Sequence, residues 1–410
     1  MGGAEVALLN MLTAIRTAQP AWRLTLILGG PGPMAAKANA LGVSAEVLTF
    51  PRSLARLGDT PVRMESANVI RRLHALAELL IAAPVAISYI RQLRRTIRRT
   101  NPDIIHTNGF KMHALGALAK PSRTALIWHV HDFVSTRPLM ARVTKQLRRR
   151  CKLILANSEC VKRDVESVCG DSGPVQTLYN AIDTNEFTPD GPQIDLDELS
   201  GLPPRASNGK PVIRVGLLAT FARWKGHEVF LHALSLTPPD LPLRGYIIGA
   251  PLYETNGSQF SIAELKTLAQ QLGVSDRVGF TGFVDQPAAA MRSLDIVVHS
   301  STQPEPFGLV IVEGMACGRP VILSEAGGAA ELLQKHNSNG KTKGQAELTA
   351  LGHAPGDAKG LAQRIVQLAS DANLRARLGL AGRATVEQRF KTDRLATELI
   401  PIYQAVKVAA

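Results

Sequence analysis

The sequence predicts an α/β protein with two doubly wound parallel sheets, one in each half of the chain. The main observation is that short apolar runs bounded by turn residues alternate with helical patterns along almost the whole chain. The length also matters, because 410 residues are too many for one ordinary hydrophobic core. Finally, the segment 188–211 is rich in Pro, Asp, Gly and Ser, and it separates the two sets of runs like an interdomain linker.

Each strand is predicted from an apolar run with turn-forming ends. In the first half the strands are expected near residues 23–30, 45–50, 103–108, 125–131, 153–158 and 175–182. In the second half they are expected near 212–219, 243–250, 277–284, 295–301 and 320–327. Helices should lie between them. The longest, Val69–Ile97, should break at Pro84, because proline lacks the N–H that a helix requires.

This alternation sets the expected domain boundaries. Residues 1–190 are predicted to form the first domain, 191–390 the second, and 391–410 a helix that packs back on the first domain. Two open parallel sheets joined in this way place a ligand cleft between them, outside the carboxyl ends of the strands. The chain opens with Gly2 and Gly3 running straight into a helical pattern, so we expect the strand that normally precedes such a turn to be encoded upstream. The polar segment 335–352 is expected to be a surface excursion.

Basic residues concentrate in the first half of the chain. Residues 1–152 hold 23 Lys and Arg against seven Asp and Glu, whereas residues 153–410 hold 24 against 27. The runs RQLRRTIRR (91–99) and KQLRRRCK (145–152) carry much of this charge beside apolar residues. Such a surface favours an anionic partner, and apolar neighbours with few aromatic residues favour a lipid surface over nucleic acid. A merely solvated basic face is the alternative.

The cysteines and the apolar segments indicate in which cellular compartment the protein lies. Cys151, Cys160, Cys169 and Cys317 form no CxxC pair and no metal-binding spacing, which indicates a reducing compartment. The most apolar window, 76–90, is too short to span a bilayer, and no signal peptide is visible. We therefore expect a cytoplasmic protein attached to the inner face of the cytoplasmic membrane through its basic first domain.

Two carboxylates in the second half require an explanation. Glu313 lies inside the apolar run 309–316, and Glu305 lies eight residues earlier between Pro304 and Pro306. A buried carboxylate without a partner is costly, so each should face a group that donates hydrogen bonds. For Glu313 the alternatives are an arginine of the chain and the hydroxyls of a ligand.

Seven motifs, in the family's order, resemble the retaining family 4 glycosyltransferases of the GT-B fold. They are GGAE, NPDIIHTNG, NSECVKRDV, YNAIDTNEF, ARWKG, DRVGFTGFV and EPFGLVIVE, the last being an E-x7-E signature. The resemblance covers nearly the whole chain. It implies two Rossmann-like domains facing across a cleft, the first on the acceptor side and the second binding a nucleotide sugar.

The resemblance also implies roles for residues of the second domain. Glu313 would accept hydrogen bonds from the ribose hydroxyls, and Glu305 from hydroxyls of the transferred sugar. The backbone amides around Phe307, Gly308 and Leu309 would hold the diphosphate at a helix N-terminus.

Cations are also expected at the diphosphate, because charge gathers there as the glycosidic bond breaks. Lys225 of ARWKG is the expected one. The family usually carries an arginine where this chain has Thr220, and Arg223 is the expected substitute. Gly282 lies in the motif that resembles the strand at the nucleotide base. With no metal-binding histidine pair in the sequence, we expect no metal and no cofactor beyond the donor.

In the first domain, His131 ends the strand WHVHDF and resembles the family histidine beside the sugar. His129 is the alternative, since alternate residues of a strand share a face. Gly2 and Gly3 are expected to let the backbone approach the acceptor or a phosphate. His131, Glu305 and Lys225 are the predicted catalytic residues.

Together these features predict a retaining, metal-independent glycosyltransferase that moves a hexose-type sugar from a nucleotide diphosphate to a lipid-linked or glycan acceptor, in the synthesis of polysaccharide or cell-envelope glycans. No nucleophilic carboxylate is evident in the first domain, so the expected mechanism is front-face, with the leaving phosphate taking the acceptor proton. A dinucleotide-dependent oxidoreductase would need GxGxxG after the first strand, which the chain lacks. A GT-B protein that binds sugar nucleotide without turnover is the other alternative.

Overall fold

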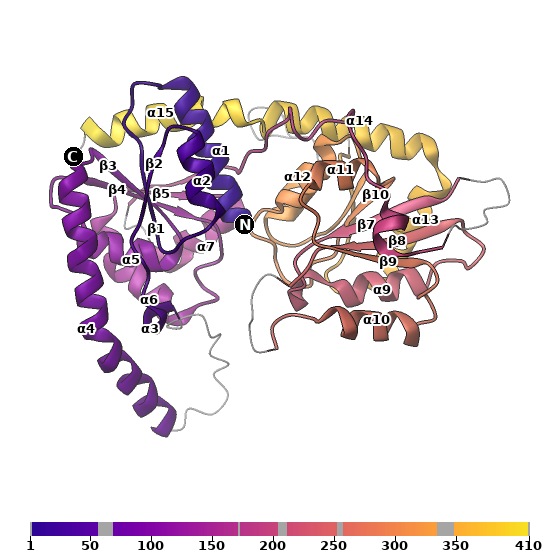
Figure 1. The fold of residues 1–410 in the computed structure, drawn as a ribbon, viewed down its shortest axis with the longest axis horizontal. Helices are drawn as coiled ribbons and strands as arrows, with labels where there is room; N and C mark the ends of the chain where they lie inside the picture. The colour runs from indigo at the N-terminus through magenta and orange to yellow at the C-terminus, as the bar shows by residue number, and fades with distance from the viewer. Residues whose placement is uncertain are drawn as a thin grey trace. The chain divides into compact units, whose positions relative to one another are not determined.

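The chain forms two compact units in the computed structural model (Figure 1). Unit 1 comprises Met1–Ala181 and Thr392–Ala410, and unit 2 comprises Ile182–Lys391. The structure describes residues 2–55, 69–170, 173–203, 211–251, 257–333 and 348–408. The boundary that we expected after residue 190 therefore falls inside unit 2.

Unit 1 contains two parallel sheets. The smaller pairs β1 (Thr25–Leu28) with β2 (Ser44–Val47), and the larger has the strand order β3-β4-β5-β6. The strands of the larger sheet are β3 (Ile104–Asn108), β4 (Ala125–Val130), β5 (Leu153–Ala156) and β6 (Val175–Thr177). All four run parallel, so their carboxyl ends share one edge of the sheet.

Helices cover both faces of this larger sheet. On one face α1 and α15 pack on Ile127, Leu153 and Leu155, and on the other face α5, α6 and α7 pack on Leu126 and Ile154. Successive residues of a strand face opposite ways, which explains why Ile154 lies against the second set. The helices of unit 1 are α1 (Gly3–Ala18), α2 (Pro33–Ala40), α3 (Arg52–Ala55), α4 (Val69–Thr100), α5 (Phe110–Ala119), α6 (Pro138–Leu147), η1 (Arg148–Arg150), α7 (Glu159–Cys169) and α15 (Thr392–Val408).

The predicted break at Pro84 is wrong. Helix α4 runs from Val69 to Thr100 with Pro84 inside it. Pro84 is exposed, so water can bond to the backbone carbonyl that loses its N–H partner there.

Unit 2 is built on one parallel sheet with the strand order β12-β11-β10-β7-β8-β9. Its strands are β7 (Ile213–Leu218), β8 (Leu243–Ile248), β9 (Val278–Gly282), β10 (Ile296–His299), β11 (Val321–Ser324) and β12 (Leu351–His353). Its helices are α8 (Leu196–Ser200), η2 (Arg223–Lys225), α9 (His227–Ser235), α10 (Ile262–Gln271), α11 (Pro287–Arg292), α12 (Leu309–Ala316), η3 (Gly328–Leu332), α13 (Ala358–Ser370) and α14 (Ala372–Arg389). The chain winds outward from β7 in one direction and from β10 in the other, so the strand order reverses between them.

The α/β class with parallel sheets is confirmed, and every predicted strand is present with shorter bounds. One strand was missed. Residues 351–353 form β12, which pairs with β11 at the edge of the sheet, although we expected 335–352 to be a surface excursion. Residues 335–347 of that segment lie outside the described part of the chain.

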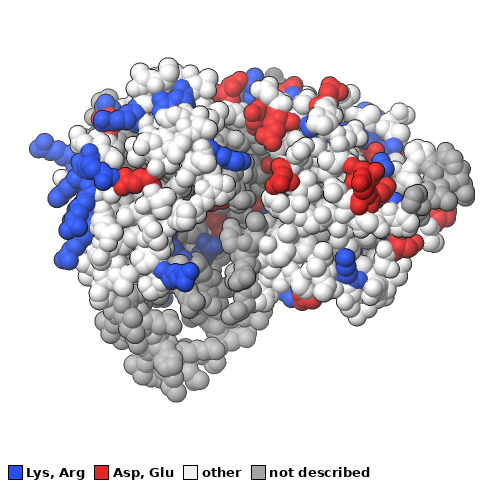
Figure 2. Space-filling model, in the orientation of Figure 1, with Lys and Arg blue, Asp and Glu red and all other residues white. Residues whose placement is uncertain are grey.

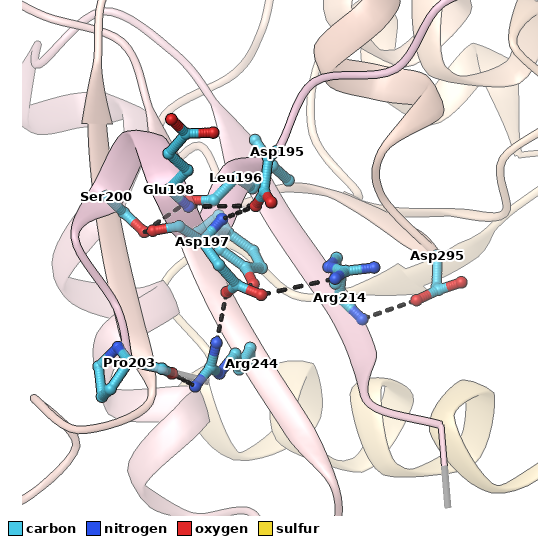
Figure 3. A network of polar contacts seen from close by, with 10 residues as sticks. Asp195, Leu196, Asp197, Glu198, Ser200, Pro203, Arg214, Arg244 and Asp295 are labelled. Carbon is cyan, nitrogen blue, oxygen red and sulfur yellow. Dashed lines mark hydrogen bonds and ion pairs between the residues drawn. The ribbon is translucent and has the colours of Figure 1, made fainter. Parts of the chain in front are cut away.

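The predicted linker 188–211 is wrong in its described part, because residues 182–203 are bound to unit 2 by hydrogen bonds. Arginine side chains hold their backbone carbonyls: Arg383 binds Thr184 and Phe187, Arg292 binds Glu186, Thr188 and Pro192, and Arg244 binds Pro203. Asp197 of α8 also accepts a hydrogen bond from Arg244 (Figure 3). It accepts another from the Tyr246 hydroxyl at 2.6 Å. Composition indicated a free linker, but buried donors fix it to the sheet.

In the described ranges, no helix combines the length and the apolar composition that a bilayer-spanning segment needs.

Candidate active site

The predicted donor-site residues of unit 2 gather on loops at the carboxyl edge of its sheet. Strand β10 ends at His299 and leads to Glu305, β7 leads to Lys225 in η2, and β11 leads to Gly327. The reversal of strand order between β7 and β10 lies at this edge. In doubly wound folds, ligands bind at such a reversal.

Glu305 is the centre of a buried cluster of hydrogen bonds. Its side chain is 10% exposed, and its Oε2 atom lies 2.8 Å from Lys225 Nζ, 3.1 Å from His299 Nε2 and 3.2 Å from Ser301 Oγ. No described residue bonds to its second oxygen, Oε1. Burial alone would raise the pKa of Glu305, but the Lys225 ammonium and the His299 N–H hold it below its ordinary range. One carboxylate oxygen is therefore fixed by the protein, while the other remains able to accept a hydrogen bond.

The proton of His299 can be placed from its neighbours. The backbone N–H of Ser324 donates to His299 Nδ1 at 3.4 Å, so Nδ1 is the acceptor and Nε2 carries the proton. That N–H points at Glu305. His299 and Ser301 were not predicted as site residues. The available signal was the polar HSS sequence that directly follows the buried apolar run of β10.

Two glycines allow the three loops of this cluster to meet backbone to backbone. A Cβ at Gly226 would lie 1.9 Å from the carbonyl oxygen of Ser300, and a Cβ at Gly327 would lie 2.3 Å from that of Glu305. Both glycines have positive φ, 76° and 68°. The N–H of Gly328 donates to the Glu305 carbonyl at 2.7 Å. The position of Glu305 thus depends on the absence of side chains at these glycines.

Helix α12 starts next to Glu305 and has no side-chain cap. Its N-cap is Gly308, with φ 95°, and no side chain bonds to its first amides. Phe307 is 2% exposed and packs against Phe390 with ring centroids 5.6 Å apart, which anchors the start of the helix. Uncapped N–H groups at a helix start favour an anion, as expected for the diphosphate around Phe307, Gly308 and Leu309.

Glu313 lies on α12, one turn after its start. Among the residues that the structure describes, none forms a side-chain hydrogen bond or an ion pair with its carboxyl group, so the arginine alternative is not observed. Burial, together with the nearby Glu186 carboxylate, raises the pKa of Glu313 to about 7. Hydroxyl donors from a ligand would satisfy this carboxylate.

Arg223 does not join the Glu305 cluster. Its guanidinium pairs with Glu264 at 2.7 Å, donates to the Gly257 carbonyl at 2.8 Å and lies over the Phe260 ring at 4.2 Å. These contacts direct Arg223 toward α10, and they give no support to its predicted role as a substitute for an arginine at position 220. Gly282 ends β9 with φ 72° and open space around its Cβ position, which is compatible with its predicted place beside a nucleotide base.

In unit 1, His131 directly follows β4 at the carboxyl edge of the larger sheet. Its Nε2 lies 2.7 Å from Asn108 Oδ1, so Nε2 carries the proton and donates it to the Asn108 amide oxygen. The buried Nδ1 has no hydrogen-bond partner among the described residues. Burial lowers the pKa of His131 to about 4, so the ring is neutral at pH 7. Nδ1 is therefore an acceptor, and Asn108, which we did not predict as a site residue, sets the tautomer.

The alternative histidine and the glycine turn have different surroundings. His129 is 5% exposed within β4, and its ring centroid lies 4.1 Å from that of His131. Gly2 precedes α1, which begins at Gly3, and the Gly2 N–H donates to Glu5 Oε2 at 2.7 Å. Of the predicted site residues, the structure thus brings Glu305 and Lys225 into direct contact. In the described ranges no three His, Cys, Asp or Glu side chains are arranged to hold a metal ion.

Comparison with known proteins identifies the family. Residues 1–186 match the model described as Glycosyltransferase Family 4, and residues 206–385 match the one described as Glycosyl transferases group 1. The chain is a group 1 glycosyltransferase of the GT-B fold. The family and the enzyme class that the motifs predicted are confirmed.

Curated and solved relatives of this glycosyltransferase agree with that assignment. It is 24% identical to N-acetyl-alpha-D-glucosaminyl L-malate synthase of Bacillus anthracis, over 79% of this chain and 80% of the relative. It is 26% identical to a GDP-mannose-dependent alpha-(1-6)-phosphatidylinositol monomannoside mannosyltransferase of Mycobacterium tuberculosis, over 69% of each. Anabaena HepE in complex with UDP superposes with a TM-score of 0.74 at 26% identity, covering 98% of this chain and 96% of HepE. The enzyme class of this chain thus rests both on its family and on its relatives.

Proposed function

We propose that this glycosyltransferase moves a hexose-type sugar from a nucleoside diphosphate to a lipid-linked or glycan acceptor, with retention of the anomeric configuration and without a metal ion. The observation that carries the proposal is the Glu305 cluster. Lys225, His299 and Ser301 all bind Oε2 and keep the carboxylate ionised, while Oε1 is left for a sugar hydroxyl. An ionised acceptor held in this way orients a sugar without taking part in the bond change.

The donor would lie along α12. Glu313 would accept from the ribose hydroxyls, and the uncapped amides at the start of α12 would hold the diphosphate. Lys225, already 2.8 Å from Glu305, would bridge the Glu305 carboxylate and the phosphate. The complexes of Anabaena HepE contain UDP, in one case with glucose, so a UDP-hexose is the first donor to test. GDP-mannose is the second, from the name of the mycobacterial relative.

The reaction would follow a front-face path. The bond from the anomeric carbon to the phosphate oxygen breaks, and the acceptor oxygen forms its bond to that carbon on the same face. The proton of the acceptor hydroxyl passes to the leaving phosphate. Lys225 and the amides of α12 would stabilise the charge that develops on the diphosphate, and the neutral His131 would accept a hydrogen bond at Nδ1 from a sugar or acceptor hydroxyl.

Attachment to the inner face of the cytoplasmic membrane is the remaining part of the proposal. Residues 1–152 carry a formal charge of +16 from 23 basic and seven acidic residues. Anionic lipid attracts each nearby Lys or Arg by about 1 kcal/mol, so several acting together give reversible binding.

A panel of sugar nucleotides and NAD(P)H tests the chemistry. Isothermal titration would identify the nucleotide, and release of free sugar, with and without EDTA, would measure turnover. The NMR coupling of the product's anomeric proton reports retention or inversion. Turnover that EDTA abolishes would contradict metal independence. Binding without any turnover, even with a lipid extract as acceptor, would favour the alternative of a non-catalytic GT-B protein.

A further inference from the structure

Cations concentrate at the end of unit 1 where the strands of the larger sheet begin. Exposed or half-exposed basic residues precede each of three neighbouring strands, and we call this set the basic edge: Arg98 and Arg99 before β3, Lys120 and Arg123 before β4, and Arg149, Arg150 and Lys152 before β5. Figure 2 shows Lys and Arg side chains gathered at one end of unit 1, near the carboxyl end of α4. Among the described acids, Glu46 pairs with Arg99 here and Asp103 pairs with Lys407.

Three of these cations act on one another. Lys120 is half-buried, and its Nζ donates to the carbonyls of Pro121, Ser122 and Thr124, at 3.0 Å for Thr124. Burial lowers the pKa of Lys120, and the nearby charges of Arg150 and Lys152 lower it further. Holding like charges together is unfavourable unless an anion compensates them.

An apolar groove adjoins this cluster. It has a volume of about 430 Å³, and most of its lining is apolar, from Leu153 of β5, Pro174 before β6, and Ile402 and Val406 of α15. Lys152 and Gln176 are its polar lining residues. Lys152 thus belongs both to the groove and to the group of cations. A nucleic acid or a free phosphate would make no use of an apolar groove, whereas a phospholipid carries a phosphate and an apolar chain on one molecule.

We propose that this end of unit 1 binds an anionic phospholipid of the membrane, with the phosphate at Lys120, Arg150 and Lys152 and an acyl chain in the groove beside α15. The inference rests on the membrane attachment in the proposed function and names its site. The strands run from this end toward Asn108 and His131, and the six residues of β4, at about 3.3 Å each, separate the two ends by about 20 Å. The docked lipid is therefore distinct from the acceptor.

Vesicle flotation with the full chain tests the site. Wild type should bind vesicles of phosphatidylcholine with phosphatidylglycerol and not vesicles of phosphatidylcholine alone. The double variant Arg150→Gln, Lys152→Gln should bind roughly 30-fold more weakly, since each cation near an anionic surface contributes a factor of about five. The control Lys359→Gln, Arg377→Gln removes two exposed cations of unit 2 and should bind as wild type does.

The groove is tested separately by Ala405→Glu, which places a carboxylate at an exposed lining position and should weaken vesicle binding with the cations intact. Dihexanoyl phosphatidylglycerol, as monomers, should bind wild type more tightly than glycerol phosphate does. Equal binding of the two, wild-type behaviour of Ala405→Glu, or equal loss in the control would overturn the site. Failure of wild type to bind anionic vesicles would overturn membrane attachment as well, whereas donor hydrolysis in solution tests the transferase chemistry independently of both.

Discussion

Glu305 and Glu313 occur in one motif, Glu305 buried and Glu313 half-buried, yet their carboxyl groups ionise differently. Three donors converge on Glu305 and hold its pKa low despite burial. Glu313 has no such donor among the described residues, and burial beside Glu186 raises its pKa to about 7. The difference comes from the partners rather than from depth. The protein itself thus supplies donors to one oxygen of Glu305 and, among the described residues, none to the carboxyl group of Glu313.

Replacing Glu305 should impair turnover more than nucleotide binding. Glu305→Gln keeps the shape but removes the charge that Lys225 and His299 bind. We expect kcat to fall roughly 100-fold, the scale for losing one charged hydrogen bond in the transition state, while the Kd of the free nucleotide changes less than about threefold. Glu325→Gln, which neutralises an exposed carboxylate after β11, is the control. Equal losses of kcat and nucleotide affinity would place Glu305 at the nucleotide instead of the sugar.

Glu313 should make nucleotide affinity depend on pH. In its proposed role the ionised carboxylate would accept both ribose hydroxyl hydrogen bonds, so affinity should rise as pH increases toward the pKa of about 7 and level off above it. In Glu313→Gln this pH dependence of nucleotide affinity should vanish. At pH 8, Glu313→Ala should bind the nucleotide more weakly than wild type by roughly 2–4 kcal/mol. Titration calorimetry from pH 5.5 to 8.5 measures both profiles. The nucleotide's own phosphate titrates equally in wild type and variant. The same pH profile in both would therefore show that Glu313 does not bind the ribose.

Among the elements, the loop before η3 determines where Glu305 lies. Gly327 combines a positive φ with a Cβ position 2.3 Å from the Glu305 carbonyl oxygen. Gly327→Ala should therefore displace the loop that holds Glu305, lower kcat at least tenfold and destabilise unit 2 by more than the roughly 1 kcal/mol that an unfavourable φ costs. Gly257→Ala is a matched control, because Gly257 also has a positive φ, 75°, but open space around it. Similar effects of the two substitutions on kcat would show that the close backbone contact does not matter.

The elements also show which features the sequence could predict. Most of the strands β1 to β11 were found because parallel strands of a sheet are largely apolar runs, and Glu305 and Lys225 lie on the loops that follow two of these runs. His299 was missed because its role depends on the Ser324 amide, which is distant in sequence. The linker was misjudged for a similar reason. Its composition is that of a loop, but the side chain that binds two of its carbonyls, those of Thr188 and Pro192, is Arg292 of α11.

For the molecule as a whole, buried titratable groups make the two units respond differently to acid. Four histidines of unit 1 are kept neutral by burial: His106 and His113, each with a pKa of about 3, His131 with a pKa of about 4, and His129 with a lowered pKa. Their contribution to stability is complete above pH 6.5. It is lost as pH falls, because the unfolded chain then binds protons that the folded unit cannot bind. In unit 2, burial lowers the pKa of His227 and of His353 in the same way. Glu313 opposes them, since a raised carboxyl pKa adds stability as pH falls below 7.

Lowering the pH from 7.5 to 5.0 should therefore destabilise unit 1 more than unit 2. At pH 5.0 each buried histidine lowers the free energy of unfolding of unit 1 by about 2 kcal/mol, because the loss is about 1.4 kcal/mol for every pH unit below 6.5. The combined loss from several histidines is a large fraction of the free energy of unfolding of a domain. Hydrogen exchange with mass spectrometry, corrected for the pH dependence of intrinsic exchange, follows peptides of both units in the intact chain. Peptides of β3, β4 and β5 should lose protection at pH 5.0 before those of β7, β8 and β10. Glu313→Gln should narrow this difference in protection between the units, because it removes the carboxyl group that stabilises unit 2 in acid. Equal loss of protection in both units of wild type would show that the buried histidines do not control acid stability.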